Sequence, residues 1–340
     1  MKNIFIIMLF VCQLLFQLAC TESPQPVSAE NGMVVSTSSY ASKVGVEILK
    51  KGGNAIDAAV AVGFALAVTY PSAGNIGGGG FMVIHLSDGK NTTIDFREKA
   101  PLSAFRKMYL NEAGEFVPEL SQQGATSAGV PGSVAGLIYA LENYGTLSLA
   151  EVIQPAIDLA TNGWRLEKRD IDYINGSMHI FEKYPSSKKI FTKYGEPYNV
   201  GDLFIQSDLA WTLEQVKENG RDGFYKGKVA ELFVEQVKSL DGYITLEDLG
   251  KYQPMEREPI IGAYRGYEII SMPPPSSGGI ALIEMLNIIE NYDLSDENLG
   301  SSQYIHQIVE AMKYAYADRT YHLGDADFYP VPKDQLLSKE

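Results

Sequence analysis

Arg97 is a candidate for binding a charged ligand. It stands at the end of a β-rich run, in the order Asp95-Phe96-Arg97-Glu98. A planar guanidinium can hold a carboxylate through two parallel hydrogen bonds, and this fixes the orientation of the bound group as a lysine would not. Spacing alone also allows an ordinary ion pair with Asp95 or Glu98, and by itself it favours that structural interpretation.

Other side chains that could act as nucleophiles or metal ligands are sparse. Both cysteines, Cys12 and Cys20, lie in the first 20 residues, so the rest of the chain has no disulfide, thiolate metal site or cysteine nucleophile. Ser276 and Ser277 lie in the run PPPSSGG, without a G-x-S-x-G turn or a nearby histidine, and we interpret them as turn and helix-capping residues. The histidines have no ligand spacing, so we expect no metal and no cofactor: His85, His179, His306 and His322.

A run of four glycines, residues 77–80, interrupts apolar sequence in the stretch GNIGGGGFM. A phosphate loop would require Lys and Ser or Thr after the glycines, and the spacing G-x-G-x-x-G fails because its sixth position falls on Met82 or Val83. Apolar sequence on both sides is not typical of a flexible linker. We therefore expect the backbone to pass close to a neighbouring element or a ligand.

The composition is that of a folded globular chain, and its negative net charge disfavours a polyanionic partner. Of the 340 residues, 45% are hydrophobic and 21% are charged, which is typical of a globular protein. The formal net charge is −14, so nucleic acid is a poor candidate partner.

Residues 1–20 have the pattern of a signal peptide. Lys2 precedes an unbroken apolar run from residue 4 to residue 12, and the segment ends in Gln17-Leu18-Ala19-Cys20 before a polar tether at residues 21–30. A small residue followed by Cys resembles a bacterial lipoprotein signal, so we expect Cys20 to be lipidated. A lipid on Cys20 would anchor the mature protein in the cell envelope, in the periplasm or at the outer membrane. Ordinary secretory cleavage near Ala19 is the alternative.

The elements that must position Arg97 are two helices and a hairpin. We expect an amphipathic helix over residues 41–51 and a core helix over residues 55–68 that is apolar on nearly every face. After the glycines, residues 81–86 and 92–97 read as two strands of a hairpin. In the second strand, Asp95 and Arg97 would share one face.

The sequence of the remaining chain predicts mostly helices. The order of helices and strands along the full chain indicates an α+β fold. At the end of the last helix we interpret Asp318 and Arg319 as a structural ion pair. Helices are expected at 133–143, 149–162, 208–219, 228–239, 279–291 and 303–320, a short one begins at Thr245, and a second strand pair is expected at 260–261 and 267–270.

Seven motifs together closely resemble the γ-glutamyltranspeptidases (glutathione hydrolases). They follow the family's order between residue 31 and the last residues of the chain. The motifs are GGNAIDAAV at 52–60, GGGGFM at 77–82, DFREKAP at 95–101, VPGSVAG at 130–136, PAI at 155–157, PPPSSGG at 273–279 and AYADR at 315–319.

The resemblance implies an N-terminal-nucleophile hydrolase with an αββα sandwich, made as a precursor that cuts itself into large and small subunits. A Thr at the start of the small subunit attacks γ-glutamyl amides such as glutathione, and the acyl group passes to water, amino acids or peptides. Arg97 matches the family's arginine for the α-carboxylate of the γ-glutamyl group. Residues 31–340 match the large subunit and stop before the Thr. We therefore expect this chain to be C-terminally incomplete, to need the small subunit from the same precursor, and to be inactive alone.

Two alternatives remain open at this point. One is a non-catalytic envelope lipoprotein that keeps the fold as a binding module. The other is a related acylase, against which Arg97 argues because it suits an α-amino-acid carboxylate.

Overall fold

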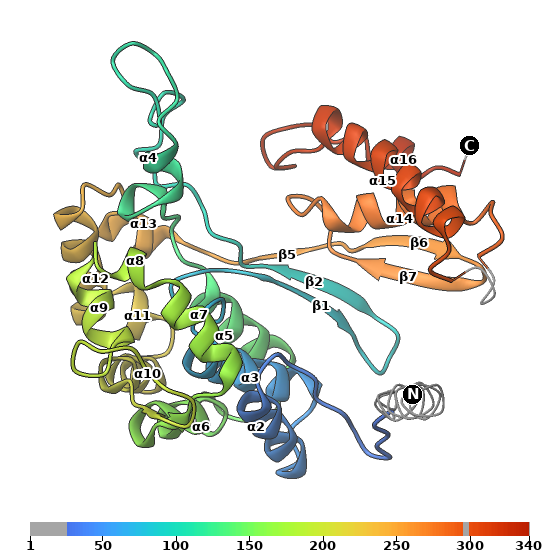
Figure 1. The fold of residues 1–340 in the computed structure, drawn as a ribbon. Helices are drawn as coiled ribbons and strands as arrows, with labels where there is room; N and C mark the ends of the chain where they lie inside the picture. The colour runs from blue at the N-terminus through green and yellow to red at the C-terminus, as the bar shows by residue number, and fades with distance from the viewer. Residues whose placement is uncertain (1–25, 295–298, 340) are drawn as a thin grey trace, which may run out of the picture. The chain divides into compact units, whose positions relative to one another are not determined.

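A computed structural model describes residues 26–294 and 299–339 (Figure 1). These residues fall into two units, divided between Val35 and Ser36, and each is treated by itself. Residues 26–35 contain no helix or strand. The expected signal peptide, Cys20 and the first half of the expected tether lie outside the described residues.

Two helices near the start of the second unit form a helical hairpin, of which the second helix is largely buried. Helix α2 spans Ser39–Lys50 and helix α3 spans Ala55–Thr69, within two residues of the expected bounds. Asn54 and Asp57 cap α3 reciprocally, and Asp57 is fully buried. Burial alone would raise the pKa of Asp57, but hydrogen bonds from Leu147, Thr146 and Asn54 outweigh it and hold this pKa below its ordinary value.

The largest sheet has three antiparallel strands in the order β1-β2-β5. Strand β1 (Phe81–His85) and strand β2 (Asn91–Asp95) form the expected hairpin, with Phe81 opposite Asp95. Strand β5 (Met255–Arg257) adds to the outer edge of β2. The expected second strand was too long, because β2 ends at Asp95 and only a pair of hydrogen bonds between Gly80 and Phe96 continues the ladder.

Two smaller sheets have two strands each. Strands β6 (Ile260–Tyr264) and β7 (Tyr267–Ser271) form the second expected pair, and each is longer than the sequence indicates. Strands β3 (Trp164–Arg165) and β4 (Leu203–Phe204) pair over only two residues, which leaves no periodicity to predict them from.

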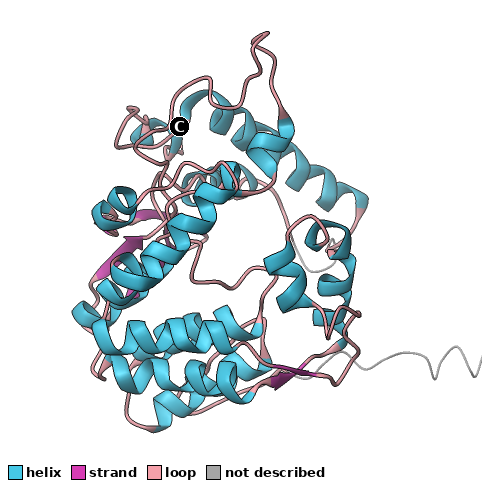
Figure 2. Cartoon of the chain, turned by 90° about the vertical axis from the view of Figure 1, so that its left-hand side faces the viewer, coloured by secondary structure: helices cyan, strands magenta, loops and turns pink. Residues whose placement is uncertain are grey.

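Helices make up most of the remaining chain (Figure 2). Helix α5 (Ser133–Tyr144) packs against β2 and α3, and α6 (Leu149–Asn162) packs against α3 (Figure 1). The other expected helices are α10 (Ser207–Asn219), α12 (Gly227–Ser239), α13 (Leu246–Lys251), α14 (Gly278–Ile289) and α15 (Ser302–His322). Short helices without a clear sequence signal are α4 (Pro118–Gln122), α7 (Lys168–Gly176), α8 (Met178–Phe181), α9 (Pro185–Phe191), α11 (Asp222–Tyr225), α16 (Lys333–Leu336) and the 3₁₀ turn η1 (Ala125–Ser127).

Helices α14 and α15 pack on each other beside the β6-β7 pair (Figure 1). Their core holds Ile260, Ile280 and Ile283, and the segment that includes α16 contributes Leu336 and Leu337 to it. The expected α+β class, with helices packed on antiparallel strands, is confirmed. Within the described ranges, no helix is both long enough and apolar enough to cross a membrane.

Candidate functional site

Arg97 lies where the chain leaves β2, and its side chain lines a cavity of about 1150 Å³. Pockets for small molecules usually hold about 300–1,000 Å³, so this one is large enough for a peptide-sized ligand. The nearest hydrogen-bond partner of the guanidinium is the carbonyl oxygen of Pro275, 3.5 Å from Nη1. No ion pair joins Arg97 to a carboxylate among the described residues. The ion pair with Asp95 or Glu98, which spacing alone favours, is therefore not formed.

Asp95 is unavailable to Arg97 because another arginine already holds it. Arg257 on β5 donates from Nε to Asp95 Oδ2 at 2.9 Å, and its two terminal nitrogens bind both oxygens of Asp327 at 2.8 and 2.7 Å. These hydrogen bonds hold the pKa of Asp327 below its ordinary value. Asp95 Oδ1 instead accepts the backbone N–H of Arg97 at 3.1 Å, so this carboxylate orients the main chain and leaves the guanidinium free.

The carbonyl side of Arg97 is held by Tyr252. The Tyr252 hydroxyl donates to the Arg97 carbonyl oxygen at 2.8 Å, and only 2% of Tyr252 is exposed. Burial raises the pKa of Tyr252, so the phenol stays neutral and remains a donor. The ring stacks on Tyr225, with 5.8 Å between centroids, and Arg221 supports both rings by donating to the Tyr252 carbonyl and lying over the Tyr225 ring. The backbone of Arg97 is therefore fixed on both sides.

The second half of the glycine run, Gly79 and Gly80, passes through a space with no room for side chains. A Cβ on Gly79 would lie 2.6 Å from the carbonyl oxygen of Phe96, and one on Gly80 would lie 2.9 Å from the Phe96 ring. The carbonyl oxygen of Gly78 accepts the backbone N–H of Gly132 at 2.7 Å. The expected close approach of backbones is confirmed, and Gly79 and Gly80 also line the cavity that holds Arg97.

Ser276 and Ser277 have different roles. Ser276 Oγ accepts the backbone N–H of Gly278 at 3.2 Å, which is the hydrogen bond of a turn that leads into α14. Ser277 makes no capping hydrogen bond with its side chain, and its Oγ instead accepts from Nε of Arg319 at 3.1 Å. The expected ion pair between Asp318 and Arg319 is therefore wrong. Successive residues of a helix point about 100° apart, so these two side chains face different neighbours.

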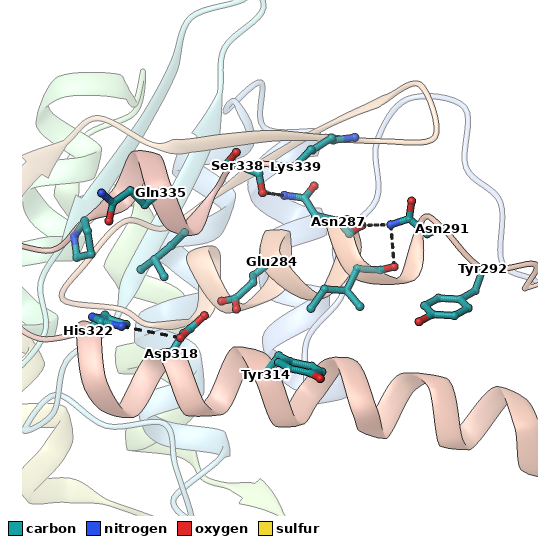
Figure 3. Close-up of a pocket in the computed structure, with 13 residues that line it drawn as sticks. Glu284, Asn287, Asn291, Tyr292, Tyr314, Asp318, His322, Gln335, Ser338 and Lys339 are labelled. Carbon is teal, nitrogen blue, oxygen red and sulfur yellow. Dashed lines mark hydrogen bonds and ion pairs between the residues drawn. The ribbon is translucent and has the colours of Figure 1, made fainter.

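Asp318 lines a second cavity, of about 590 Å³, between α14, α15 and the segment of α16 (Figure 3). It faces Glu284 of α14, and its Oδ1 lies 3.9 Å from Nε2 of His322. Burial, followed by a hydrogen bond with Asp318, raises the pKa of Glu284 to about 7. Near neutral pH Glu284 can therefore keep its proton and donate it in a hydrogen bond to Asp318. Sequence reasoning missed this pair, for which the one signal was a lone acid in the apolar run GGIALIEMLNII.

The remaining predicted site residue, Cys20, lies outside the described residues. In the ranges 26–294 and 299–339, no three His, Cys, Asp or Glu side chains are grouped so that they could hold a metal ion.

Comparisons with known proteins agree on one family. A profile of the γ-glutamyltranspeptidase family matches residues 41–340. The chain is 50% identical over 319 residues to the glutathione hydrolase proenzyme of Pseudomonas sp. (strain A14), covering 94% of this chain and 56% of that protein. It is 49% identical over 316 residues to the Escherichia coli (strain K12) glutathione hydrolase proenzyme, covering 92% and 54%. The chain thus spans about half the length of these curated relatives.

A solved structure gives the same result for the fold. The crystal structure of the Helicobacter pylori γ-glutamyltranspeptidase superposes with a TM-score of 0.91 at 52% identity, covering 93% of this chain and 90% of that one. The predicted fold, that of the N-terminal-nucleophile hydrolases, is therefore confirmed.

Proposed function

This chain belongs to the γ-glutamyltranspeptidase family, and we propose that it works as part of a γ-glutamyltransferase and glutathione hydrolase. Such an enzyme cleaves γ-glutamyl amides such as glutathione and passes the γ-glutamyl group to water, an amino acid or a peptide. The observation that carries the proposal is the Arg97 guanidinium, which faces a cavity without a carboxylate partner among the described residues while its own backbone is fixed on both sides.

In this proposal Arg97 binds the α-carboxylate of the γ-glutamyl group. A bidentate pair sets both the position and the direction of the substrate, so the γ-amide comes to one place at each binding event. Asp95 and Tyr252 act on the backbone of Arg97 and keep the guanidinium at a constant position relative to the sheet. They are positioning residues and need no contact with substrate.

We propose that the nucleophile comes from a small subunit made in the same precursor. The curated relatives are named proenzymes, and this chain spans about half of their length. The family resemblance gives the small subunit an N-terminal Thr, whose own α-amine can act as the base that activates its hydroxyl. The reaction then needs two residues from different parts: Arg97 orients the donor, and Thr forms the γ-glutamyl ester. This chain alone is expected to be inactive.

We also propose that the protein is exported and anchored by a lipid on Cys20. The support is the sequence of residues 1–20, with its apolar run and its ending Leu18-Ala19-Cys20. Mass spectrometry of the mature N-terminus tests this, because an unmodified terminus or cleavage without a lipid would contradict it.

The two alternatives are less well supported. Close sequence identity to glutathione hydrolases is not expected of a non-catalytic binding module. An acylase for a side chain without an α-carboxylate would have no use for Arg97, which has no other carboxylate to bind among the described residues.

The decisive experiment compares two chromogenic anilides on the complete enzyme, made by co-expressing this chain with a small subunit that begins at its Thr. One anilide carries a γ-glutamyl group, and the other carries 4-aminobutyryl, which lacks only the α-carboxylate. We expect the γ-glutamyl anilide to react faster by about 10- to 100-fold in kcat/KM, and Arg97→Gln to abolish most of this preference. Equal rates on the two anilides with the unmodified enzyme would contradict the proposal.

A further inference from the structure

Three arginines line the cavity that holds Arg97, and of the other two, Arg257 is ion-paired while Arg319, among the described residues, is not. Arg319 lies in the last turn of α15 and lines this cavity. Its Nε donates to Ser277 Oγ at 3.1 Å, and its guanidinium carbon lies 6.0 Å from the centroid of the Tyr316 ring. Across residues 26–294 and 299–339, no ion pair or hydrogen bond engages its two terminal nitrogens. Two contacts thus orient the side chain, and its two terminal nitrogens remain available to bind a carboxylate.

The acidic residues of the cavity do not neutralise Arg319. Asp95 and Asp327 are both bound by Arg257. Asp325 accepts the backbone N–H of Asp327 at 3.0 Å. Glu98 also lines the cavity and forms no ion pair with Arg319. No carboxylate of the described residues comes within ion-pair distance of Arg319, so the cavity offers two guanidinium groups to anions from outside this chain.

The two guanidinium groups contact the same short segment. Arg97 reaches the carbonyl oxygen of Pro275, and Arg319 reaches the hydroxyl of Ser277, two residues further along. Two residues of extended chain span about 7 Å, and a tripeptide spans about 10 Å. The segment turns at Ser277, so about 7 Å is an upper limit for the separation of these two contacts, and a γ-glutamyl tripeptide held at its α-carboxylate by Arg97 is comparable in length to that separation.

We propose that Arg319 binds a second substrate carboxylate. This inference rests on the proposed γ-glutamyl transfer and adds a specificity to it: substrates with a free C-terminal carboxylate are preferred. The carboxylate could be that of the leaving peptide of the donor, as in glutathione, or that of an acceptor amino acid or peptide. Both sources offer the same chemistry to a bidentate guanidinium, and two arms of one experiment separate them.

The experiment uses the complete two-part enzyme with Arg319→Gln and Arg319→Lys. In the donor arm, hydrolysis of glutathione is compared with hydrolysis of γ-glutamyl p-nitroanilide, whose leaving group has no carboxylate. In the acceptor arm, transfer to glycylglycine is compared with transfer to glycylglycine amide. Arg106→Gln is the matched control, because Arg106 is exposed and does not line the cavity.

We expect Arg319→Gln to lower the ratio of kcat/KM for the carboxylate-bearing substrate to that for its neutral partner by about 10- to 100-fold in one arm. The affected arm identifies the source of the carboxylate. Arg319→Lys should lower the same ratio less, since it keeps the charge and loses the bidentate geometry, and the control should keep the original ratio.

Unchanged ratios in both arms would overturn the inference, including the case in which both substrates of a pair slow equally because Arg319 binds a carboxylate of the small subunit. This outcome leaves the proposed function intact, since the unmodified enzyme still turns over the anilide. An unmodified enzyme that cleaves no γ-glutamyl compound would overturn both proposals.

Discussion

The hydroxyl of Tyr252 donates a hydrogen bond to the carbonyl oxygen of Arg97, with 2.8 Å between the two oxygens. The two residues are 155 positions apart in the sequence, and the contact joins the segment after α13 to the end of β2. Because the Asp95 carboxylate holds the N–H of the same residue, the peptide units on both sides of Arg97 are fixed before any substrate arrives. Such preorganisation lowers the entropy that binding would otherwise lose.

Tyr252→Phe tests this positioning role. The substitution removes the hydroxyl and leaves the Arg97 carbonyl without its buried donor, which should cost about 1–3 kcal/mol of folding free energy. With the peptide less constrained, we expect kcat/KM for γ-glutamyl anilide to fall several-fold, while the preference over the 4-aminobutyryl anilide largely survives because the guanidinium is still present. A loss of stability with unchanged kinetics would show that Tyr252 supports the fold only.

Arg97→Lys tests the guanidinium itself. A lysine keeps the positive charge but cannot form the bidentate pair, so we expect a steep rise in KM for γ-glutamyl substrates and a loss of about 10- to 100-fold in kcat/KM. Self-cleavage of the precursor should survive, since Arg97 is proposed to contact substrate and not the new terminus. Gel analysis of processing and steady-state kinetics check both parts. Unchanged kcat/KM in a correctly processed variant would return Arg97 to a structural role.

Helices α3 and α6 could be predicted because their signals are local. Asn54 and Asp57 lie three residues apart and cap α3 in the expected way, and Ser148 and Glu151 do the same for α6. Strand β5 could not be predicted in this manner. It has three residues, Met255–Arg257, and exists only because it pairs with β2, more than 150 residues earlier in the chain.

In the candidate site, too, local features could be predicted from the sequence and long-range contacts could not. The residue type and the motif around Arg97 select it from the sequence as a candidate, and its contact with substrate stays a prediction. Its freedom from Asp95 could not be predicted, because that depends on Arg257, which is 162 residues away from Asp95. The pair of Glu284 and Asp318 and the contact of Arg319 with Ser277 likewise depend on how α14 packs on α15. Sequence spacing carries no information about contacts of that range.

Gly79→Ala tests whether the glycine run is needed for space. The added methyl group would lie 2.6 Å from a backbone oxygen, which cannot move without displacing Phe96 and the start of the Arg97 segment. Overpacking of this kind costs about 1–3 kcal/mol, and we expect a lower denaturant midpoint together with weaker activity. Gly77→Ala is the matched control, because the nearest atom to its new methyl group would lie 3.9 Å away. Equal midpoints for the two variants would contradict the steric explanation.

The raised pKa of Glu284, at the interface of α14 and α15, predicts that the stability of the protein depends on pH. The groups that face it are Asp318, His322 and Tyr314 of α15, while Lys339 of the terminal segment binds Glu290 instead. The pKa of Glu284 is about 7 in the folded chain and 4.5 for an ordinary Glu, so the folded state binds the proton more tightly. The associated stabilisation is complete below pH 4.5 and is lost as the pH rises through 7.

Glu284→Gln isolates this effect, because the amide keeps a neutral donor facing Asp318 and cannot titrate. Between pH 5 and pH 8, we expect the unfolding free energy of the unmodified protein to fall by about 1 kcal/mol more than that of the variant, a value kept small because Glu284 is partly exposed. Denaturant titrations of the complete enzyme at several pH values measure the difference. Glu310→Gln serves as the control, since Glu310 lies on the same helix as Asp318 but pairs with Lys313 on the surface. Parallel curves for the unmodified protein and Glu284→Gln would show that the pKa of Glu284 is not raised in the folded protein.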